Sequence, residues 1–340
     1  MIVVGNLDCE VTWAGGPPLP GAVTARLALL ATTLRVFARD DDDRLWLPAP
    51  VDPAQVPAAG APRPRLVAGP VPAGDDLLPW GALAPTDVAV ARAVNDRRFA
   101  AVVAADLGVA LPGARVVTSV DELRAHLAAG GAGASPTGAW VAKAPLTAAG
   151  RDRVRRRGDA LDPPTATRLE RLLARAGALV FEPWMARTLD VGQGGVVVAA
   201  DRVELSPPHR AHCDAAGVIR GLVVDDGAAL EPGERATLAA TATAVGHRLA
   251  AAGYRGRFVV DAFVHDAGGA RRLHPLCEIN ARLTFGLVAR AWAERRGRPI
   301  VLGLDDAPPP GAEPLVHAAD GTPAAWLATV ESAHAPAPPP

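Results

Sequence analysis

The chain has 340 residues, 49% of them hydrophobic and 21% charged, which is typical of a globular protein with two or three domains rather than a disordered chain. Its 35 basic and 36 acidic side chains nearly cancel, so charge gives no reason to expect a nucleic acid or a membrane surface as partner. Three widely separated cysteines, no basic-then-apolar leader and no long apolar run predict a cytoplasmic protein without disulfides or a membrane span.

The first 92 residues predict a small α/β unit. Short apolar runs at 2–4, 34–38 and 65–68 are typical of buried strands, and residues 22–31 predict a helix. Gly5 follows the first of these strands, but no G-x-G-x-x-G pattern accompanies it. The sequence therefore indicates a simple turn there rather than a dinucleotide-binding loop.

The next segment predicts two helices and then a strand that ends on a lysine. Asn95-Asp96 opens a helix that runs to Leu107, and Ser119-Val-Asp-Glu122 is a capping-box pattern for the second helix. The strand 140–143 ends at Lys143, the only lysine in the sequence. A lysine retained in so arginine-rich a chain indicates a functional role.

An arginine-rich loop is predicted at 144–158, directly after Lys143. Its small residues let backbone N–H groups approach a ligand, and its arginines offset negative charge, so the loop suits a lid over phosphates. A basic surface loop without a ligand is the alternative that the local sequence leaves open.

The second half of the chain alternates between strands and helices. The strand 178–182 runs into Pro183-Trp184-Met185, and a loop at 207–217 carries His209-Arg210. Further strands are expected at 191–200, 202–206 and 218–224, and helices at 163–176, 234–252 and 287–296. Residues 305–340, rich in Pro and Ala, predict one strand near 325–330 and a disordered end.

Two strands joined by a glycine-containing turn form the most informative stretch of the sequence. The first strand carries Asp261, and the second carries Glu278 and Asn280, with Arg282 two residues on. Because side chains alternate along a strand, Glu278, Asn280 and Arg282 are expected on one face, whereas Cys277 is expected on the other. Two carboxylates and an amide oxygen are donors suited to magnesium beside a phosphorylated ligand. A solvated surface hairpin is the alternative for this motif alone.

Several short motifs fall in one order along the chain. They are Asn95-Asp96-Arg97, Trp140-Val-Ala-Lys143 with the loop after it, Phe181-Glu182-Pro183-Trp184-Met185, Asp190, Asp261 and Glu278-Ile-Asn280-Ala-Arg282. In this order the chain resembles the ATP-grasp superfamily, whose members hold ATP between two α+β subdomains behind an N-terminal pre-ATP-grasp α/β domain. The resemblance covers roughly residues 93–300 and extends loosely to residues 1–92. It implies a mixed α+β and α/β architecture, an ATP-grasp fold preceded by a Rossmann-like α/β domain.

The resemblance also implies where the domains begin and end. The pre-ATP-grasp domain is expected at 1–92, and the N-terminal ATP-grasp subdomain, with its phosphate lid loop at 144–158, is expected at 93–181. The C-terminal subdomain with the metal site is expected at 182–304. A Pro- and Ala-rich tail with one strand is expected at 305–340.

Eight residues match ATP-binding positions of the superfamily. They are Arg97, Lys143, Gly150, Arg151, Glu182, Pro183, Met185 and Asp190. Lys143 corresponds to the lysine on the α- and β-phosphates, and Glu182 to Met185 correspond to the hinge beside adenine, with Asp190 on the ribose. Arg97 stands where many members have a second phosphate-binding lysine, and arginine is not a geometric copy of lysine. The lid also departs from the glycine-rich version, because Gly150 is the only glycine among residues 146–151.

The remaining site residues are candidate metal ligands, catalytic residues and substrate contacts. Asp261, Glu278 and Asn280 match the ligands of Mg²⁺, with Mn²⁺ as an alternative ion. Arg282 matches an arginine that faces the transferred phosphate, so Arg282 and Lys143 are the expected catalytic residues. His209-Arg210 is a candidate substrate contact, with a plain surface turn as the alternative.

The implied function is an ATP-dependent ligase that joins a small-molecule carboxylate to an amine through an acylphosphate. Two alternatives stay open, a small-molecule kinase of the same fold and a nucleotide-binding module without catalysis. The expected cofactors are ATP and Mg²⁺, and the expected partners are small molecules, with neither nucleic acid nor membrane. A homodimer is a further expectation, because dimers are common in this superfamily.

Overall fold

The computed structural model describes the chain except for residues 75, 148–151, 215–217 and 332–340. Its internal contacts group it into two compact units, each assembled from separate stretches of sequence. Unit 1 comprises residues 1–85, 207–230 and 282–340, and unit 2 comprises residues 86–206 and 231–281. Within the described residues, every helix is too short or too polar to cross a membrane.

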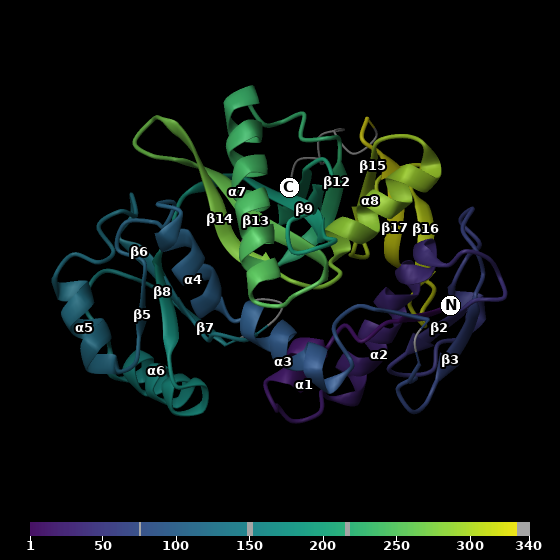
Figure 1. Cartoon of the computed structure of the whole chain (residues 1–340), viewed down its shortest axis with the longest axis horizontal. Helices are drawn as coiled ribbons and strands as arrows, with labels where there is room; N and C mark the ends of the chain where they lie inside the picture. Colours follow the sequence, from purple (N-terminus) through teal and green to yellow (C-terminus); the bar gives the residue numbers. More distant parts are fainter. Residues whose placement is uncertain (75, 148–151, 215–217, 332–340) are drawn as a thin grey trace. The chain divides into compact units, whose positions relative to one another are not determined.

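Unit 1 opens with a four-stranded parallel sheet in the order β3-β2-β1-β4. Figure 1 labels β2 and β3 of this sheet, near the N-terminus. The strands are β1 (Ile2–Val4), β2 (Arg44–Leu47), β3 (Arg65–Ala68) and β4 (Leu77–Pro79). The helical segments are α1 (Cys9–Trp13), α2 (Gly21–Ala31), η1 (Thr32–Phe37) and η2 (Pro53–Gln55). Strand order reverses at β1, because β2 lies on one side of it and β4 on the other.

The strand expected at 34–38 is wrong, because this stretch is the 3₁₀ helix η1. The chain continues in helical conformation from α2, and the hydroxyls of Thr32 and Thr33 donate to the carbonyls of Leu29 and Leu30 at 2.7 Å. Threonine bonds of this kind hold the chain in the turn despite its apolar, β-branched sequence.

The rest of unit 1 contains antiparallel strands in the order β11-β12-β15-β17-β16 and one helix. These elements are β11 (His209–Cys213), β12 (Ile219–Val224), α8 (Phe285–Arg296), β15 (Ile300–Gly303), β16 (Glu313–His317) and β17 (Pro323–Thr329). Two expectations are wrong here. The expected loop contains β11, whose polar sequence lacks the alternation of a strand, and the tail contains two strands instead of one. The extra strand, β16, holds Pro314, which is tolerated because β16 ends this strand order.

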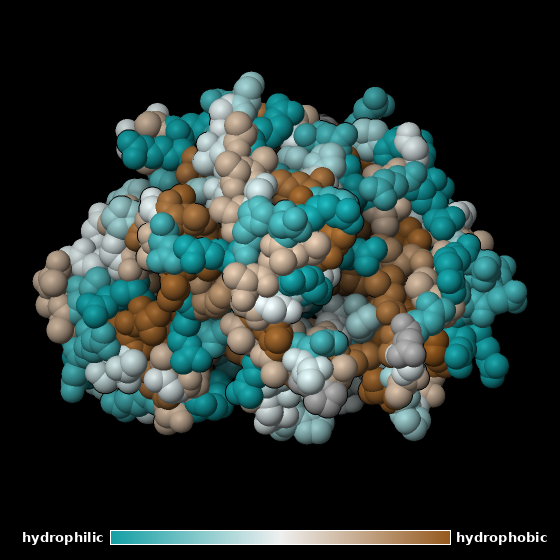
Figure 2. Space-filling view, in the orientation of Figure 1, coloured by the Kyte–Doolittle hydropathy of each residue, from teal (hydrophilic) through white to brown (hydrophobic). Residues whose placement is uncertain are grey.

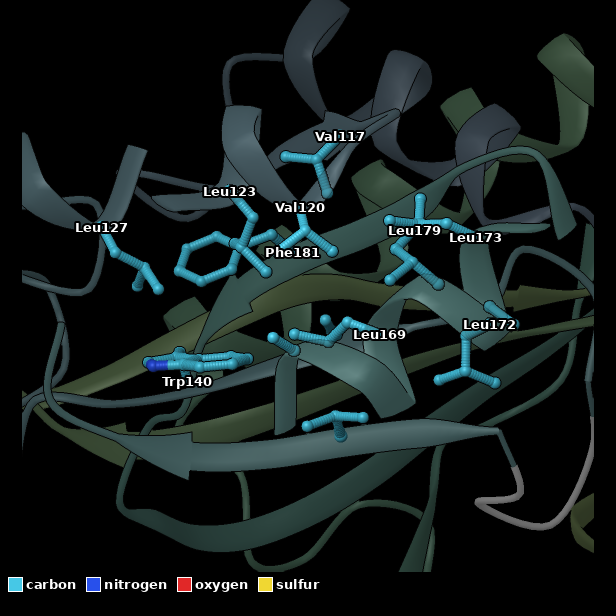
Figure 3. Close-up of a cluster of buried hydrophobic side chains, with 14 of the residues drawn as sticks. Val117, Val120, Leu123, Leu127, Trp140, Leu169, Leu172, Leu173, Leu179 and Phe181 are labelled. Carbon is cyan, nitrogen blue, oxygen red and sulfur yellow. The ribbon is translucent and has the colours of Figure 1, made fainter. Parts of the chain in front are cut away.

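Unit 2 contains an antiparallel sheet in the order β5-β8-β6-β7, covered by two helices. The elements are β5 (Arg115–Val117), α5 (Val120–Ala128), β6 (Ala139–Lys143), β7 (Arg153–Arg157), α6 (Pro163–Ala176) and β8 (Leu179–Pro183). Figure 3 shows their core, in which Trp140 and Phe181 lie with ring centroids 5.8 Å apart beside Leu123 and Leu169. Burial of these large side chains is the main source of stability for this layer.

The expected loop 144–158 contains the strand β7, so that expectation needs correction. Residues Arg153–Arg157 pair with Ala139–Lys143 as an antiparallel edge. Arginines on the solvent side of an edge strand are a common protection against aggregation. Because they are polar, the segment lacks the hydrophobic pattern by which a strand is predicted.

The other strands of unit 2 have the order β14-β13-β9-β10. Its elements are β9 (Arg187–Val197), β10 (Val203–Leu205), β13 (Gly256–Asp266) and β14 (Arg271–Asn280), with the helices α3 (Pro85–Val94), α4 (Arg97–Asp106) and α7 (Pro232–Ala251). Phe258, Leu276 and Leu249 belong to the core between sheet and helices. The predicted hairpin is confirmed, and its turn contains Gly268 and Gly269, both with positive φ.

On the face drawn in Figure 2, hydrophilic residues are interspersed with hydrophobic ones. The exposed large hydrophobic side chains include Val102 and Ile219, at 58% and 42% exposure. Exposed apolar residues of this kind are normal on a folded surface.

Candidate functional site

The β13–β14 hairpin brings the three candidate metal ligands together. The strand register places Asp261 directly opposite Glu278, and Asn280 follows two residues later, opposite Val259. The side-chain amide nitrogen of Asn280 donates to Asp261 Oδ2 at 2.8 Å. The amide nitrogen is thereby engaged with a carboxylate, so the amide oxygen is the atom of Asn280 suited to a cation.

Glu278 is held by an arginine from another element of the same unit. Arg97, at the start of α4, places Nη2 2.8 Å from Glu278 Oε1 and is 8% exposed. Its guanidinium also donates to the carbonyl of Ala144 and to both the hydroxyl and the carbonyl of Thr147, each at 2.9 Å. Arg97 therefore ties the first residues after Lys143 to the strand that carries Glu278.

Lys143 forms an ion pair with Glu182 across the neighbouring strands β6 and β8. The Nζ to Oε2 distance is 2.6 Å, and the side chains are 12% and 17% exposed. Burial lowers the pKa of Lys143, but the charge of Glu182 more than offsets it, so the pKa is raised overall. Burial raises the pKa of Glu182, yet Lys143 turns the net pKa shift downward. Both groups are therefore charged at neutral pH.

The hinge after β8 is packed against a second arginine. Arg187 lies 5.2 Å from the ring centroid of Trp184 and 4.2 Å from that of Phe263. Its Nη1 donates to Asp190 Oδ1 at 3.0 Å. Met185, 5% exposed, packs in the same apolar cluster as Phe263. Asp190 is therefore oriented by Arg187 beside the hinge.

A cavity of about 230 Å³ lies beside these groups, within unit 2. Its walls include Leu111, Val180, Glu182, His274 and Cys277. Burial lowers the pKa of His274 to about 4, although the charge of Glu182 opposes the shift. Burial also raises the pKa of the Cys277 thiol. At neutral pH the cavity thus presents one carboxylate, a neutral imidazole and a protonated thiol, together with the guanidinium groups of Arg97 and Arg115, among apolar side chains.

Nine sequence-predicted site residues belong to unit 2. They are Arg97, Lys143, Glu182, Pro183, Met185, Asp190, Asp261, Glu278 and Asn280. The predicted lid contacts Gly150 and Arg151 lie outside the described residues. Their part in a site stays a prediction.

Three further residues of this site were not predicted from the sequence. Arg187 stands three residues before Asp190, a spacing that carries no signal by itself. His274 and Cys277 reach the cavity because the ladder between β13 and β14 shifts register after Asp261, near Pro275. That Cys277 lies on the face of β14 away from Glu278 stays a prediction.

The other predicted residues, Arg282, His209 and Arg210, belong to unit 1. Arg282 pairs with Glu10 at 2.5 Å, and the two side chains are 12% and 6% exposed. Arg210 Nη2 lies 2.7 Å from Asp225 Oδ2. The surface turn proposed as the alternative for His209-Arg210 is wrong, because both residues lie in β11 and His209 is 5% exposed.

Among the described residues, no cluster of three or more His, Cys, Asp and Glu side chains has the arrangement of a metal site. The candidate set differs from such a cluster because it combines two carboxylates with one amide. Oxygen donors of this kind suit a hard divalent cation, whereas the set contains no thiolate or imidazole for a softer metal.

Comparisons with known proteins place the fold. No protein-family model matches the chain, and no curated protein matches it. N5-carboxyaminoimidazole synthetase from Staphylococcus aureus, complexed with ADP, is similar over 96% of this chain and 91% of its own, with a TM-score of 0.57 and 10% identity. The biotin carboxylase–β,γ-ATP complex from Campylobacter jejuni is similar over 96% and 86%, with a TM-score of 0.59 and 11% identity. N5-carboxyaminoimidazole ribonucleotide synthetase from Thermus thermophilus is similar over 96% and 92%, with a TM-score of 0.56 and 14% identity.

These similarities assign the chain to a class by its architecture. It has the ATP-grasp fold, preceded by an N-terminal α/β region with a parallel sheet, and the predicted fold is confirmed. At 10 to 14% identity the comparisons define the fold alone.

Proposed function

We propose that this protein is an ATP-dependent ligase that joins a small-molecule carboxylate to an amine through an acylphosphate and releases ADP and phosphate. One observation carries the proposal. The cationic pair of Arg97 and Lys143 and the oxygen donors Asp261, Glu278 and Asn280 converge within unit 2, which belongs to a chain with the ATP-grasp fold. Cations and a hard-oxygen site together suit a nucleoside triphosphate.

The similar structures support a nucleotide and a ligase-type reaction. Two of them contain ADP or an ATP compound, and their names describe synthetases and a carboxylase. In our proposal ATP lies against Lys143, Arg97 and the lid, with its base in the cavity beside Glu182. Pro183 and Met185 contribute backbone groups to the base, and Asp190 contributes its carboxylate to the ribose.

Asp261, Glu278 and Asn280 are the residues that would hold Mg²⁺, or Mn²⁺ in its place. A divalent ion bound there supplies charge neutralisation for the phosphates. For Glu278 to take part, its carboxylate must share or exchange its pairing with Arg97. Arg97 would then turn toward the phosphates, which are negatively charged like the Glu278 carboxylate that it leaves.

The reaction proceeds in two steps. An oxygen of the substrate carboxylate attacks the γ-phosphorus, the bond between that phosphorus and the β–γ bridging oxygen breaks, and ADP leaves. The nitrogen of the amine then attacks the acyl carbon, the C–O bond to phosphate breaks, and the amine loses a proton. Lys143 offsets charge on the transferred group, and the lid excludes water from the acylphosphate.

Phosphate release in an array that pairs carboxylates with amines tests this function. We expect release that requires ATP, a divalent cation, one carboxylate and one amine together. Glu278→Ala is expected to lower turnover by at least about 100-fold, as loss of a group that stabilises transition-state charge does. The matched control is Glu294→Ala, since Glu294 is an exposed carboxylate on α8.

Two outcomes of this array would select the alternatives. A stable phosphorylated product formed without any amine identifies a kinase. Calorimetric ATP binding without turnover across the array identifies a non-catalytic nucleotide-binding module. Full turnover by Glu278→Ala would show that the β13–β14 hairpin is not part of the active site.

A further inference from the structure

The edge strand β7, in unit 2, concentrates positive charge. Four of its five residues are arginines, in the sequence RVRRR. It is the last strand in the order β5-β8-β6-β7, and among the described residues it pairs only with β6. The whole chain has nearly equal numbers of basic and acidic residues, so this charge is a local property of the strand. β7 therefore presents a basic edge to which another strand can be added.

The backbone of β7 directs alternate hydrogen-bonding groups away from β6. The Gly158 N–H donates to the Gly138 carbonyl at 2.9 Å, directly after the last pair of the β6–β7 register. Because bonded and non-bonded pairs alternate along an antiparallel ladder, Arg155 and Arg157 belong to non-bonded pairs, and their N–H and C=O groups point outward. The Arg155 carbonyl accepts from Nη1 of Arg156 at 3.1 Å, which agrees with this outward direction.

The guanidinium groups along this edge are held in place by uncharged partners. The Arg155 guanidinium lies 4.1 Å from the ring centroid of Trp184. Arg156 donates to a threonine hydroxyl of α6 at 2.7 Å, and Arg168 of α6 donates to a backbone carbonyl of β7 at 2.9 Å. A guanidinium stacked on a ring keeps its N–H donors directed outward, where they suit a carboxylate. Charge alone protects an edge, so the fixed positions of these groups are what indicates a partner.

We propose that β7 is a docking edge for an extended acidic segment of a partner protein. The segment adds to the sheet as a further strand, and its Asp or Glu side chains pair with Arg155 and Arg157. Its backbone supplies both donors and acceptors to the outward groups of β7, while its carboxylates offset the arginines. This docking edge does not depend on the ligase proposal.

Two other occupants complement this edge less well. A second copy of the chain paired through β7 would set arginine opposite arginine, and like charges directly opposite each other destabilise a strand pair. The phosphates of a nucleic acid would pair with the arginines. However, phosphate oxygens only accept hydrogen bonds, so they would leave the outward carbonyls of β7 without donors.

The test is the fluorescence anisotropy of a labelled peptide in which glutamate and threonine alternate, titrated with the full chain at about 0.15 M salt. We expect saturable binding. The double change Arg155→Gln and Arg157→Gln is expected to weaken it at least about tenfold, because charge-assisted hydrogen bonds are lost. Arg202→Gln is the matched control, since Arg202 is an arginine of the same unit with 63% exposure.

Two altered peptides separate charge from strand pairing without changing the protein. One has glutamine in place of glutamate and so lacks the carboxylates. The other is N-methylated at its glutamates and so lacks the backbone donors of a strand. Each is expected to bind at least about tenfold more weakly than the parent peptide, because docking uses both kinds of contact.

Amide hydrogen exchange of the ¹⁵N-labelled chain locates the bound peptide. We expect the peptide to slow exchange at the N–H groups of Arg155 and Arg157, whereas Val154, whose N–H faces β6, keeps its rate. Lys143→Met is expected to bind the peptide as the parent chain does, because Lys143 belongs to the proposed nucleotide site rather than to the edge.

Several outcomes would overturn the proposal. They are a peptide that does not bind, equal binding of the N-methylated peptide, and loss of binding in Lys143→Met, which would place the peptide at the nucleotide site. A single-stranded oligonucleotide that binds more tightly than the peptide and displaces it would identify a nucleic-acid surface instead. Self-association of the chain that the double arginine variant abolishes would identify a second copy as the occupant.

Discussion

At the scale of single residues, the pair of Lys143 and Glu182 has consequences for stability as well as for ATP. Because both side chains are mostly buried, removing the cation leaves a carboxylate without a partner in a poorly solvated place. We expect Lys143→Met to lower the free energy of unfolding by about 3 kcal/mol, measured by urea denaturation. Adding Glu182→Gln to the same chain is expected to recover part of the loss.

The control for this change is a surface ion pair of the same unit. Arg202 and Glu204 are each 63% exposed, with Nε and Oε1 3.4 Å apart. Arg202→Met is expected to change stability by less than about 0.5 kcal/mol, because solvent screens the pair. Equal losses of unfolding free energy in Lys143→Met and Arg202→Met would show that burial of the Lys143–Glu182 pair does not raise its contribution to stability.

His274 makes the stability of the fold depend on pH. Burial holds its pKa near 4 in the folded chain, below the ordinary value of 6.5, so the unfolded chain binds the proton more readily. The contribution of neutral His274 is therefore complete above pH 6.5 and is lost as pH falls toward 4, by at most about 3 kcal/mol.

Urea unfolding at a series of pH values checks this prediction. His274→Gln is expected to flatten the fall in stability between pH 6.5 and 4, because glutamine does not titrate. His247→Gln, at an exposed position on α7, serves as the control. An unchanged slope in His274→Gln would place the acid sensitivity elsewhere in the chain.

At the scale of elements, a glycine that ends a helix differs in backbone conformation from a glycine inside a helix. Gly177 ends α6 with φ at 73°, a left-handed conformation that costs other residues strain. Gly233 stands in the first turn of α7 without positive φ. Neither position has another atom within 4 Å of an added Cβ, so crowding does not distinguish them.

We therefore expect opposite signs from the same substitution. Gly177→Ala should destabilise by about 1 kcal/mol, and Gly233→Ala should stabilise by about 0.5 kcal/mol, because alanine restricts the unfolded chain. Thermal unfolding of the two variants checks this difference. Shifts of the same sign would contradict it.

The sequence was most informative for elements whose ends are marked by capping residues. The helix at 163–176 has the predicted bounds, with Asp162 as N-cap and Gly177 at its end. The errors fall on elements whose conformation is decided by neighbours. β7 and β11 are polar strands held by backbone pairing, and η1 is an apolar segment held in a turn by threonine bonds.

At the scale of the whole molecule, the fold could be predicted because its motifs keep their order over a long stretch. The partition into two units could not, because each unit is assembled from separated segments whose contacts no local pattern encodes. The proposed domain boundaries and the assignment of ATP and metal contacts stay predictions. The pairing of Arg97 with Glu278, both singled out in the sequence for different ligands, likewise required coordinates.

The central claim is that a carboxylate of the substrate becomes an acylphosphate. It is tested most directly by ¹⁸O transfer, with the carboxylate and amine identified by the phosphate-release array. A substrate labelled in both carboxylate oxygens is turned over, and the released phosphate is analysed by mass spectrometry. We expect each phosphate to carry one ¹⁸O atom, because the attacking carboxylate oxygen leaves with the phosphoryl group. Product formation with unlabelled phosphate would contradict the account.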